Sequence, residues 1–248
     1  MTNPLTLPNV RKLFIPDPGY IIGDFDLAQA DAQVVAWEAD DELLKAIFRD
    51  PDADLHTENA KTIFGYCNDK KRKLAKAGVH ATNYAAGPRT LARALGITTH
   101  EAELFQRKWF SAHPGIKDWH RRVQDSLTHT RSVTNKFGFR RMYFDRIDGI
   151  LPEALAWIPQ STVALCIDKG LVAVEENIPE VEPLLQVHDS FVLQWEKRYH
   201  PHILQRIRKH GEVVVPYNDP LIIPLGAAVS DRSWGDVVDV DWDGNPVG

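Results

Sequence analysis

Cysteine and long apolar segments are scarce in this sequence, and both absences restrict what the protein can be. Its 248 residues include only two cysteines, Cys67 and Cys166, in unrelated segments without CxxC spacing. A disulfide framework or a cysteine zinc site is therefore not expected, and a reducing cytoplasm fits this composition. No apolar run approaches the ~20 residues of a transmembrane helix, and the first residues lack the apolar core of a signal peptide. We accordingly expect a cytoplasmic protein without a membrane partner.

A positive net charge, which nucleic-acid-binding proteins usually carry, is also missing. The formal net charge is −5 at pH 7, and the sequence pI is about 6.1. The basic residues are nevertheless clustered, at Lys70–Lys73 with Lys76, at Arg121–Arg122, at Arg140–Arg141 and at Arg206–Lys209. Any one cluster is most simply a solvated helix face, but an acidic total does not exclude a local basic surface.

Several common catalytic patterns do not occur. The sequence has no GxxxxGK[ST] phosphate loop and no GxGxxG fingerprint. The run His188–Ser190 contains the residue types of a catalytic triad, but adjacent side chains cannot relay a proton as a triad requires. His56, Cys67 and His80 lack the spacing of a zinc site.

The predicted secondary structure is a strand, then many helices, then strands again. Strands are expected over residues 20–27, 184–187, 191–195 and 221–229, with a hairpin over 132–144 around Gly138. Helices are expected over roughly 29–38, 41–48, 54–64, 70–84, 89–96, 99–112, 115–129, 152–176 and 200–210, and Pro159 is expected to kink the eighth. This order predicts an α+β fold, with a small antiparallel sheet assembled from both ends of the chain and a largely helical insertion between them.

Two aspartates lie at the ends of predicted apolar strands. Asp26 ends the first strand, and Asp189 lies in the tight turn between two late strands. Carboxylates beside buried strand sequence are costly without a partner, and two that meet at a sheet edge form an oxygen-rich site suited to magnesium. A pair of ions ~4 Å apart can hold both the attacking and the leaving oxygen of a phosphoryl transfer. The alternative is that each aspartate only caps a turn or a helix.

A second group of residues recurs every four positions along the predicted helix 70–84. Arg72, Lys76, His80 and Tyr84 share one helix face, because four residues advance by ~400° and each step drifts by only ~40°. Arginine and lysine suit triphosphate oxygens, while histidine and tyrosine can lie against a sugar and a base. We call these four residues the stripe. A solvated basic helix would explain its first two members, but not its continuation into His80 and Tyr84.

Together these elements resemble the palm and fingers of family A (polymerase-I-type) DNA polymerases, over about residues 10–238. The segment 26–33 (DLAQADAQ) resembles the first polymerase motif, the stripe resembles the second, and 186–190 (QVHDS) resembles the third. Four shorter segments also occur in the family's order: Asp54-Leu55-His56, His113-Pro114-Gly115, Pro159-Gln160-Ser161-Thr162 and Ser233-Trp234-Gly235. The resemblance is carried by the order and spacing of all these motifs.

The resemblance implies a DNA-directed DNA polymerase, a nucleotidyltransferase that joins dNTPs to a primer 3′-hydroxyl and releases pyrophosphate. By this likeness Asp26 and Asp189 ligate two Mg²⁺ ions, for which Mn²⁺ can substitute, and the Leu27 carbonyl helps. Lys76 is implied to supply a proton to the leaving pyrophosphate.

The other implied roles concern the nucleotide and the DNA. The triphosphate is implied to be held by His56, Arg72 and Lys76. Asp31 takes the place of the steric gate under the sugar, and His80 takes the place of the side chain that packs on the deoxyribose. The residues implied to touch DNA are Tyr84 near the templating base, Gln160 in the minor groove and His188 at the primer end.

Some residues depart from the family's usual pattern. Asp31 stands where the family has Glu, so the gate is one methylene shorter. His80 stands where Phe or Tyr is usual, Ala85 follows Tyr84 in place of Gly, and the third motif ends in Ser190 in place of Glu. The variants at His80 and Ser190 look more like phage polymerases than bacterial ones. The expected location is therefore a bacterial cytoplasm or a phage-infected host.

The resemblance further implies a right-hand polymerase fold lacking most of the thumb and the exonuclease domain. The expected parts are an N-terminal palm segment over residues 1–53, fingers over 54–130 and a C-terminal palm segment over 131–248. The expected partners are primer–template DNA, dNTPs and a separate polypeptide that supplies the thumb and exonuclease domains. Alternatively, the chain is an unusually small polymerase or a part excised from a larger one.

Two further functions are weighed against template-directed DNA synthesis. A non-catalytic nucleic-acid-binding subunit derived from a polymerase fits the acidic total. However, a binding subunit does not need two aspartates together with a stripe suited to binding phosphates. A nuclease using the same carboxylates gives no reason for the stripe.

Overall fold

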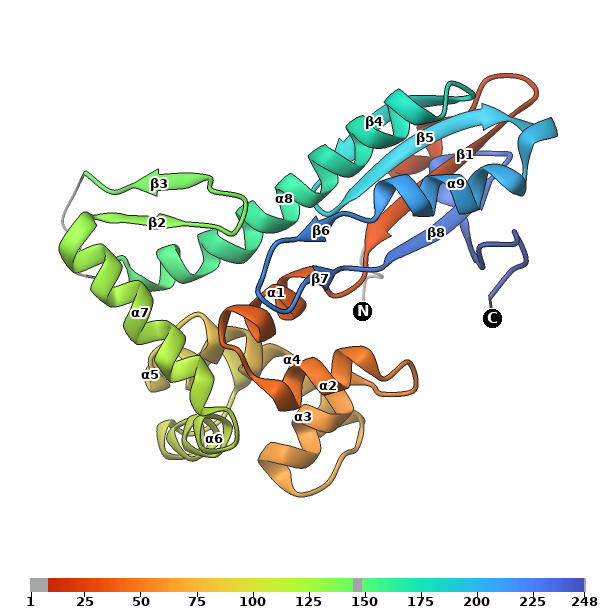
Figure 1. Ribbon diagram of the computed structural model, residues 1–248. Coiled ribbons are helices and arrows are strands. Elements are labelled where there is room, and N and C mark those ends of the chain that lie inside the picture. The colour runs from red at the N-terminus through yellow and green to blue at the C-terminus, as the bar shows by residue number, and fades with distance from the viewer. Residues whose placement is uncertain (1–8, 145–148, 248) are drawn as a thin grey trace. The chain divides into compact units, whose positions relative to one another are not determined.

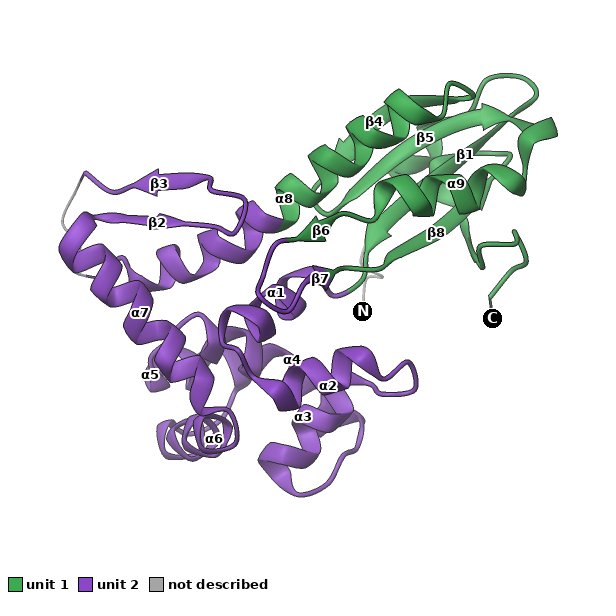
Figure 2. Cartoon of the chain, in the orientation of Figure 1, with its two compact units in different colours: residues 1–28, 163–215, 222–248 green, residues 29–162, 216–221 purple. Residues whose placement is uncertain are grey.

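A computed structural model describes residues 9–144 and 149–247. The chain forms two compact units, coloured separately in Figure 2. Unit 1 comprises residues 1–28, 163–215 and 222–248, and unit 2 comprises residues 29–162 and 216–221. Among the described residues, no helix is both long enough and apolar enough to cross a membrane.

Unit 1 is built on a five-stranded sheet that takes its strands from both ends of the chain (Figure 1). The order is β4-β5-β1-β8-β9, with β1 at Tyr20–Leu27, β4 at Val181–Val187, β5 at Ser190–Glu196, β8 at Leu225–Ser230 and β9 at Val238–Val240. Every neighbouring pair is antiparallel. The predicted α+β class, with an antiparallel sheet assembled from both chain ends, is confirmed.

Two helices cover one face of this sheet. They are α9 (His202–Gly211) and the C-terminal part of α8 (Leu151–Asn177). Phe25 of β1 and Phe191 of β5 point to this face and stack with ring centroids 5.5 Å apart. The helices cross closely because both have glycine there: a Cβ on Gly170 would lie 2.5 Å from the Gly211 carbonyl oxygen. The apolar alternation of the strands thus places a dense core on this side.

The opposite face of the sheet is only partly covered. Ile22, Val192 and Trp234 form a small buried cluster there. Two 3₁₀ segments, η1 (Val10–Leu13) and η3 (Trp234–Asp236), contact each other at this face. Because alternate residues of a strand point the same way, Asp24 and Asp26 project from the same face as Ile22.

One predicted strand is divided in the structure. The sequence predicts a single strand over 221–229, whereas β7 covers Leu221–Ile222 and β8 begins at Leu225. Pro224 lies in the gap and has no N–H to donate to a strand ladder. Its carbonyl accepts a hydrogen bond from the Ala28 N–H at 2.9 Å. The short elements β6 (Val214–Val215), β9 and η2 (Lys197–Tyr199) were also not predicted.

Unit 2 is mainly helical. Its helices are α1 (Ala30–Glu38), α2 (Glu42–Arg49), α3 (Leu55–Phe64), α4 (Asp69–Asn83), α5 (Pro88–Leu95), α6 (Thr99–Ala112), α7 (Pro114–Thr130) and the start of α8. A hairpin of β2 (Ser132–Thr134) and β3 (Arg140–Met142) follows α7. All predicted helices are found within a residue or two of their expected bounds, and α8 runs through Pro159. The kink predicted there stays a prediction.

The helices begin and pack where local chemistry favours it. The Asn68 side chain caps α4 by accepting from the Lys71 N–H at 2.9 Å, and Thr98 and Glu101 form a capping box at α6. Helices α4 and α6 approach closely at Gly78, where a Cβ would lie 2.4 Å from the Phe105 ring. This glycine therefore sets the position of α4, the helix that carries most of the stripe.

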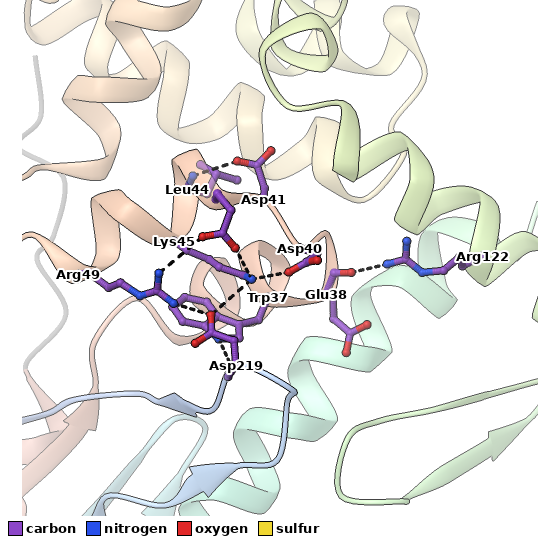
Figure 3. A network of polar contacts seen from close by, with 10 residues as sticks. Trp37, Glu38, Asp40, Asp41, Leu44, Lys45, Arg49, Arg122 and Asp219 are labelled. Atoms are coloured by element: carbon purple, nitrogen blue, oxygen red, sulfur yellow. Dashed lines mark hydrogen bonds and ion pairs between the residues drawn. The ribbon is translucent and has the colours of Figure 1, made fainter.

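A buried lysine ties the segment 216–221 to α1 and α2 (Figure 3). Lys45 is 2% exposed, and its ammonium donates to Asp40 and to Glu42, with Asp219 at 3.4 Å. Burial opposes the charge, but the hydrogen bonds to Asp40 and Glu42 raise the pKa of Lys45 above its ordinary value. Trp37 adds a hydrogen bond from Nε1 to the Asp219 carbonyl at 2.8 Å. The lysine therefore stays charged and fixes this segment within unit 2.

The compact units divide the chain at different places from the predicted palm and fingers. The predicted boundaries lie after residues 53 and 130, whereas the chain contacts divide it after residues 28 and 162. Helix α2 was predicted as part of the palm, but it packs on α3 and so belongs to unit 2. Strand β2, also predicted as palm, packs on α7 and belongs to unit 2 as well. The palm and fingers are defined by function and not by compactness, so their predicted boundaries stay a prediction.

Candidate active site

The sheet of unit 1 brings Asp26 and Asp189 together. Asp26 pairs in register with Ser190, the residue after Asp189, and the Leu27 N–H donates to the Asp189 carbonyl at 2.9 Å. The two aspartates therefore belong to one sheet, as expected, but they lie at the ends of inner strands and not at an outer edge of the sheet. Leu27 itself is buried at the end of β1.

Both aspartates line a cavity of about 340 Å³ on the partly covered face of the sheet. We call it the carboxylate cavity. Gly226 and Ala228 of β8 face Asp26 and Asp24 across the strand pair, and their small size leaves the face open. The other lining residues are Arg11, Val187, His188, Ser190, Ala227, Val237 and Asp239. The site is thus a shallow acidic recess walled by strand ends.

Two further carboxylates, Asp24 and Asp239, line this cavity and were not singled out from the sequence. Asp24 Oδ2 accepts a hydrogen bond from Trp234 Nε1 at 2.6 Å, and Arg11 Nη1 lies 3.8 Å from the same oxygen. The Ser233-Trp234-Gly235 motif therefore holds the carboxylate that precedes Asp26 by two residues. The sequence could have identified Asp24 as a site residue through its spacing from Asp26, because residues two apart on a strand share a face.

The carboxylates of this recess repel one another. Partial burial raises the pKa of Asp26, and the nearby charges of Asp189, Asp24 and Asp239 raise it further. Within the described residues, the side chains of Asp26 and Asp189 have no hydrogen-bond or ion-pair partner. A cation bound here would relieve the repulsion, and carboxylate oxygens are the ligands that magnesium prefers.

The described residues supply only part of a metal coordination shell. No group of three or more histidine, cysteine, aspartate or glutamate side chains converges among them closely enough to hold an ion. Magnesium commonly binds one or two carboxylates and takes its remaining ligands from water and from substrate phosphates. The pair Asp26 and Asp189 fits that kind of site, and it does not fit an all-protein cage.

The turn that carries Asp189 has an unusual backbone. His188 adopts φ 54°, a left-handed conformation that favours glycine, and its side chain is exposed in the carboxylate cavity. Ser190 Oγ donates to the Val187 carbonyl at 3.3 Å and so closes the same turn. Non-glycine residues in this conformation are enriched at functional sites, and this one adjoins Asp189. Ser190 thus has a structural partner in this turn.

In unit 2, three stripe residues line a second cavity, of about 480 Å³. They are Lys76, His80 and Tyr84, and His56 lines the same space from α3. The other lining residues are Ala32, Val35, Leu55, Asn59, Lys73, Ala77, Val79 and Asn83. We call this space the α3–α4 cavity. It is cationic at one end and aromatic at the other, as the stripe predicts.

Arg72 is oriented differently from the rest of the stripe. It does not line the α3–α4 cavity, and its guanidinium instead forms two hydrogen bonds with the Asp54 carboxylate, at 2.8 and 2.7 Å. The predicted contact of Arg72 with a triphosphate stays a prediction.

The aromatic end of the cavity is held together by contacts between predicted site residues. His80 and Tyr84 contact edge to face, with ring centroids 4.8 Å apart. Tyr84 OH donates to Asp31 Oδ2 at 3.3 Å. Burial and the Asp31 carboxylate together raise the pKa of Tyr84, so the phenol stays protonated and remains a donor. Asp31 and Tyr84, which lie 53 residues apart, thus form one polar pair.

The cationic end of the cavity contains two buried polar atoms without partners. Burial lowers the pKa of His56, and the positive charge of Lys76 lowers it further, so this histidine is neutral at pH 7. Its Nδ1 has no hydrogen-bond partner among the described residues. Asn59, one turn later on α3, is 2% exposed, and its Oδ1 also lacks a partner there. Asn59 was missed from the sequence, although its spacing of three from His56 places both on one helix face.

Gln160 lies on α8 within unit 2 and is exposed. The predicted contact of Gln160 with the minor groove of DNA stays a prediction.

Comparisons with known proteins identify relatives over almost the whole chain. DNA polymerase I of Helicobacter pylori (strain ATCC 700392 / 26695) is 28% identical over 243 residues, which are 92% of this chain and 26% of that protein. The thermostable DNA polymerase I of Thermus filiformis is 29% identical over 241 residues, 91% of this chain and 28% of that protein. The DNA polymerase of Mycobacterium phage D29 is 28% identical over 246 residues, 96% of this chain and 39% of that protein. The chain thus spans between a quarter and two fifths of the length of these relatives.

The fold also matches a solved structure, the POL domain of Pol1 from M. smegmatis in complex with DNA primer–template and dNTP. The TM-score is 0.81 at 23% sequence identity, and the match covers 91% of this chain and 42% of that one. This likeness concerns the fold. The sequence profile of DNA polymerase family A matches residues 5–236, and the chain therefore belongs to this family.

Proposed function

We propose that the chain carries the active site of a template-directed DNA polymerase, which transfers nucleotides from dNTPs to a primer 3′-hydroxyl. Membership of DNA polymerase family A supports the reaction class. The single observation that carries the proposal for this chain is the pair of unpartnered carboxylates, Asp26 and Asp189. These side chains repel each other at a strand edge and have no structural partner among the described residues.

In this proposal Asp26 and Asp189 hold two magnesium ions, with the Leu27 carbonyl as a further ligand. When bound, the ions supply charge neutralisation at the attacking and leaving oxygens of the phosphoryl transfer. The pairing of Asp26 with Ser190, the residue after Asp189, supports this assignment because it brings the two aspartates to neighbouring positions. His188, held at φ 54° beside Asp189, is proposed to contact the primer end.

The α3–α4 cavity is proposed to receive the nucleotide. Lys76 and neutral His56 bind triphosphate oxygens at the cationic end, and Lys76 gives a proton to the leaving pyrophosphate. The new bond joins the primer 3′-oxygen to the α-phosphorus, and the bond from this phosphorus to pyrophosphate breaks. Catalysis therefore rests on positioning and charge, as is general for phosphoryl transfer.

The aromatic end of the same cavity is proposed to select the sugar and the base. His80 packs on the deoxyribose, and Asp31 is the gate beneath it. Tyr84 holds Asp31 through its hydrogen bond and lies near the templating base. Gln160 is proposed to read the minor groove of the nascent pair. The palm over residues 1–53 and 131–248 and the fingers over 54–130 are part of this proposal.

Extension of a 5′-labelled primer on a longer template, with magnesium or manganese and dNTPs, tests the proposal. Asp26→Ala and Asp189→Ala are expected to lose roughly three orders of magnitude in rate. Asp231→Ala removes an exposed carboxylate that pairs with Lys197 in the same unit and is the matched control, with near-normal activity expected. Unchanged extension by either active-site variant contradicts the assignment. A wild-type chain that binds primer–template but never extends it supports a non-catalytic binding subunit instead.

A further inference from the structure

The Asp54 carboxylate links two helices of unit 2. Its Oδ1 caps α3 by accepting from the Thr57 N–H at 2.8 Å. The same carboxylate accepts from Arg72 on α4, from Nε at 2.8 Å and from Nη2 at 2.7 Å. One side chain therefore starts the helix that carries His56 and also holds the first cation of the stripe.

The geometry leaves part of the guanidinium available. Arginine presents its N–H donors in a rigid planar fork, so two bonds to one carboxylate determine where the rest of the fork points. Asp54 takes the Nε donor and one Nη2 donor of Arg72. Within the described residues Nη1 donates to no acceptor. The pair therefore orients Arg72 without using up its capacity to bind an anion.

The pair lies beside the cationic end of the α3–α4 cavity. Burial is the main cause of the lowered pKa of His56, and the charges of Lys76 and Arg72 lower it further while that of Asp54 opposes them, so the pair acts on this ring. Lys76 follows Arg72 by one helical turn and lines the cavity, as His56 does. The hydrogen bond from Arg72 holds the pKa of Asp54 well below its usual range, so the ion pair persists at any pH used for an assay.

We propose that Asp54 is a positioning residue for nucleotide binding. It holds the guanidinium of Arg72 next to Lys76 and His56, with the Nη1 donors left to bind the triphosphate of an incoming dNTP at the mouth of the α3–α4 cavity. The physical reason is preorganisation: a free arginine loses side-chain entropy when it binds, whereas a held one has lost it already. This inference rests on the proposed polymerase function and extends it to a residue that contacts neither metal nor primer.

Two other roles for the same contact make different predictions. A purely structural link between α3 and α4 affects stability alone. If Asp54 instead keeps Arg72 away from the nucleotide, then removal of Asp54 should strengthen nucleotide binding. A positioning role makes loss of Asp54 weaken nucleotide binding, and only while Arg72 is present.

The informative variant is Asp54→Asn. Asparagine is as good a helix N-cap as aspartate, so the start of α3 is retained while the charged fork to Arg72 is lost. Glu58→Gln is the matched control, because it removes an exposed carboxylate that pairs with Lys61 on the same helix. KM for dNTP and kcat are measured by primer extension, and dNTP-dependent protection against thermal unfolding gives a second readout without catalysis.

For Asp54→Asn we expect KM for dNTP to rise about fivefold, with kcat changed by less than about twofold. Glu58→Gln should leave both unchanged. In an Arg72→Ala background, Asp54→Asn should have no further effect on KM, because a positioning residue acts only through the group that it positions. The dNTP-dependent protection should fall in parallel with the rise in KM.

An unchanged or lower KM in Asp54→Asn overturns the inference, as does an equal effect of this variant with and without Arg72. These outcomes leave the polymerase proposal intact, provided that the wild-type chain extends primers. A wild-type chain that neither extends primers nor is protected by dNTPs refutes the proposed function and the inference with it.

Discussion

Neutralising Asp26 should stabilise the metal-free protein while it abolishes activity. In Asp26→Asn the side-chain volume is kept, but the repulsion from Asp189, Asp24 and Asp239 is removed. Because the pKa of Asp26 is raised in the folded chain, the folded state binds this proton more tightly than the unfolded state. Stability is therefore lost as the pH rises from the ordinary carboxyl range through the raised pKa, and the full loss is present at neutral pH.

The magnitude follows from screened charge interactions. A pair of like charges ~7 Å apart costs about 0.6 kcal/mol in water and about 2.4 kcal/mol at an effective dielectric of about 20. Asp26 is only partly buried and keeps much of its contact with solvent, so three such neighbours together are discounted to about 1 kcal/mol. For a chain of this length that corresponds to a rise of about 2–4 °C in Tm.

The assay is thermal unfolding of both proteins at neutral pH, first with a chelator and then with millimolar magnesium. Asp26→Asn should melt above the wild type in chelator. Magnesium should raise the Tm of the wild type and not that of the variant, so that the difference shrinks or reverses. Asp231→Asn, which breaks an exposed ion pair with Lys197, should not gain stability.

Two results would refute this reasoning. One is an Asp26→Asn protein that melts below the wild type in chelator, which would show that the carboxylate has a stabilising partner. The other is a magnesium effect of equal size in both proteins, which would place the ion elsewhere.

Three further substitutions are expected to change the free energy of unfolding. His188→Gly should raise the free energy of unfolding in urea by about 0.5–1 kcal/mol, because glycine tolerates φ 54°, while primer extension falls. Gly78→Ala should lower the free energy of unfolding by about 1–3 kcal/mol, since a Cβ would lie 2.4 Å from the Phe105 ring. Gly87 has open space around it, so Gly87→Ala should leave this free energy nearly unchanged. Asn59→Leu should gain about 1 kcal/mol by removing a buried amide oxygen without a partner, and it should weaken dNTP protection in thermal unfolding. A loss of stability in Asn59→Leu with unchanged dNTP protection would mean that the amide is part of the core and not of a site.

Features with a short sequence range could be predicted from the sequence. The spacing of four residues in the stripe depends only on helix geometry, and α4 indeed brings Lys76, His80 and Tyr84 to one cavity. The apolar run before Asp26 similarly predicts β1, because a strand buried in mid-sheet needs apolar residues on both faces. Motif order then indicated the family.

Features that depend on which surfaces meet could not be predicted in this way. The fork between Arg72 and Asp54 joins two helices whose packing no local pattern specifies. The interruption between β7 and β8 at Pro224 was not predicted, because the apolar residues on both sides of it have the pattern of a single strand. Asn59 looked like an ordinary helix residue until the packing of α3 against α4 buried it beside a cavity.

By itself the sequence determined the helices, the first strand, the stripe and the family, because each of these depends on neighbours in the chain or on motif order. Only the tertiary structure decided which carboxylates gather at the strand edge. Asp24 shares the face of Asp26 through its spacing in β1, but Asp189 and Asp239 come to this face through the antiparallel pairing of β1, β5, β8 and β9. A shift of one residue in β9, for example, would turn Asp239 to the other face of the sheet. The acidic recess is therefore a property of strand pairing, which hydrogen bonds between distant segments establish.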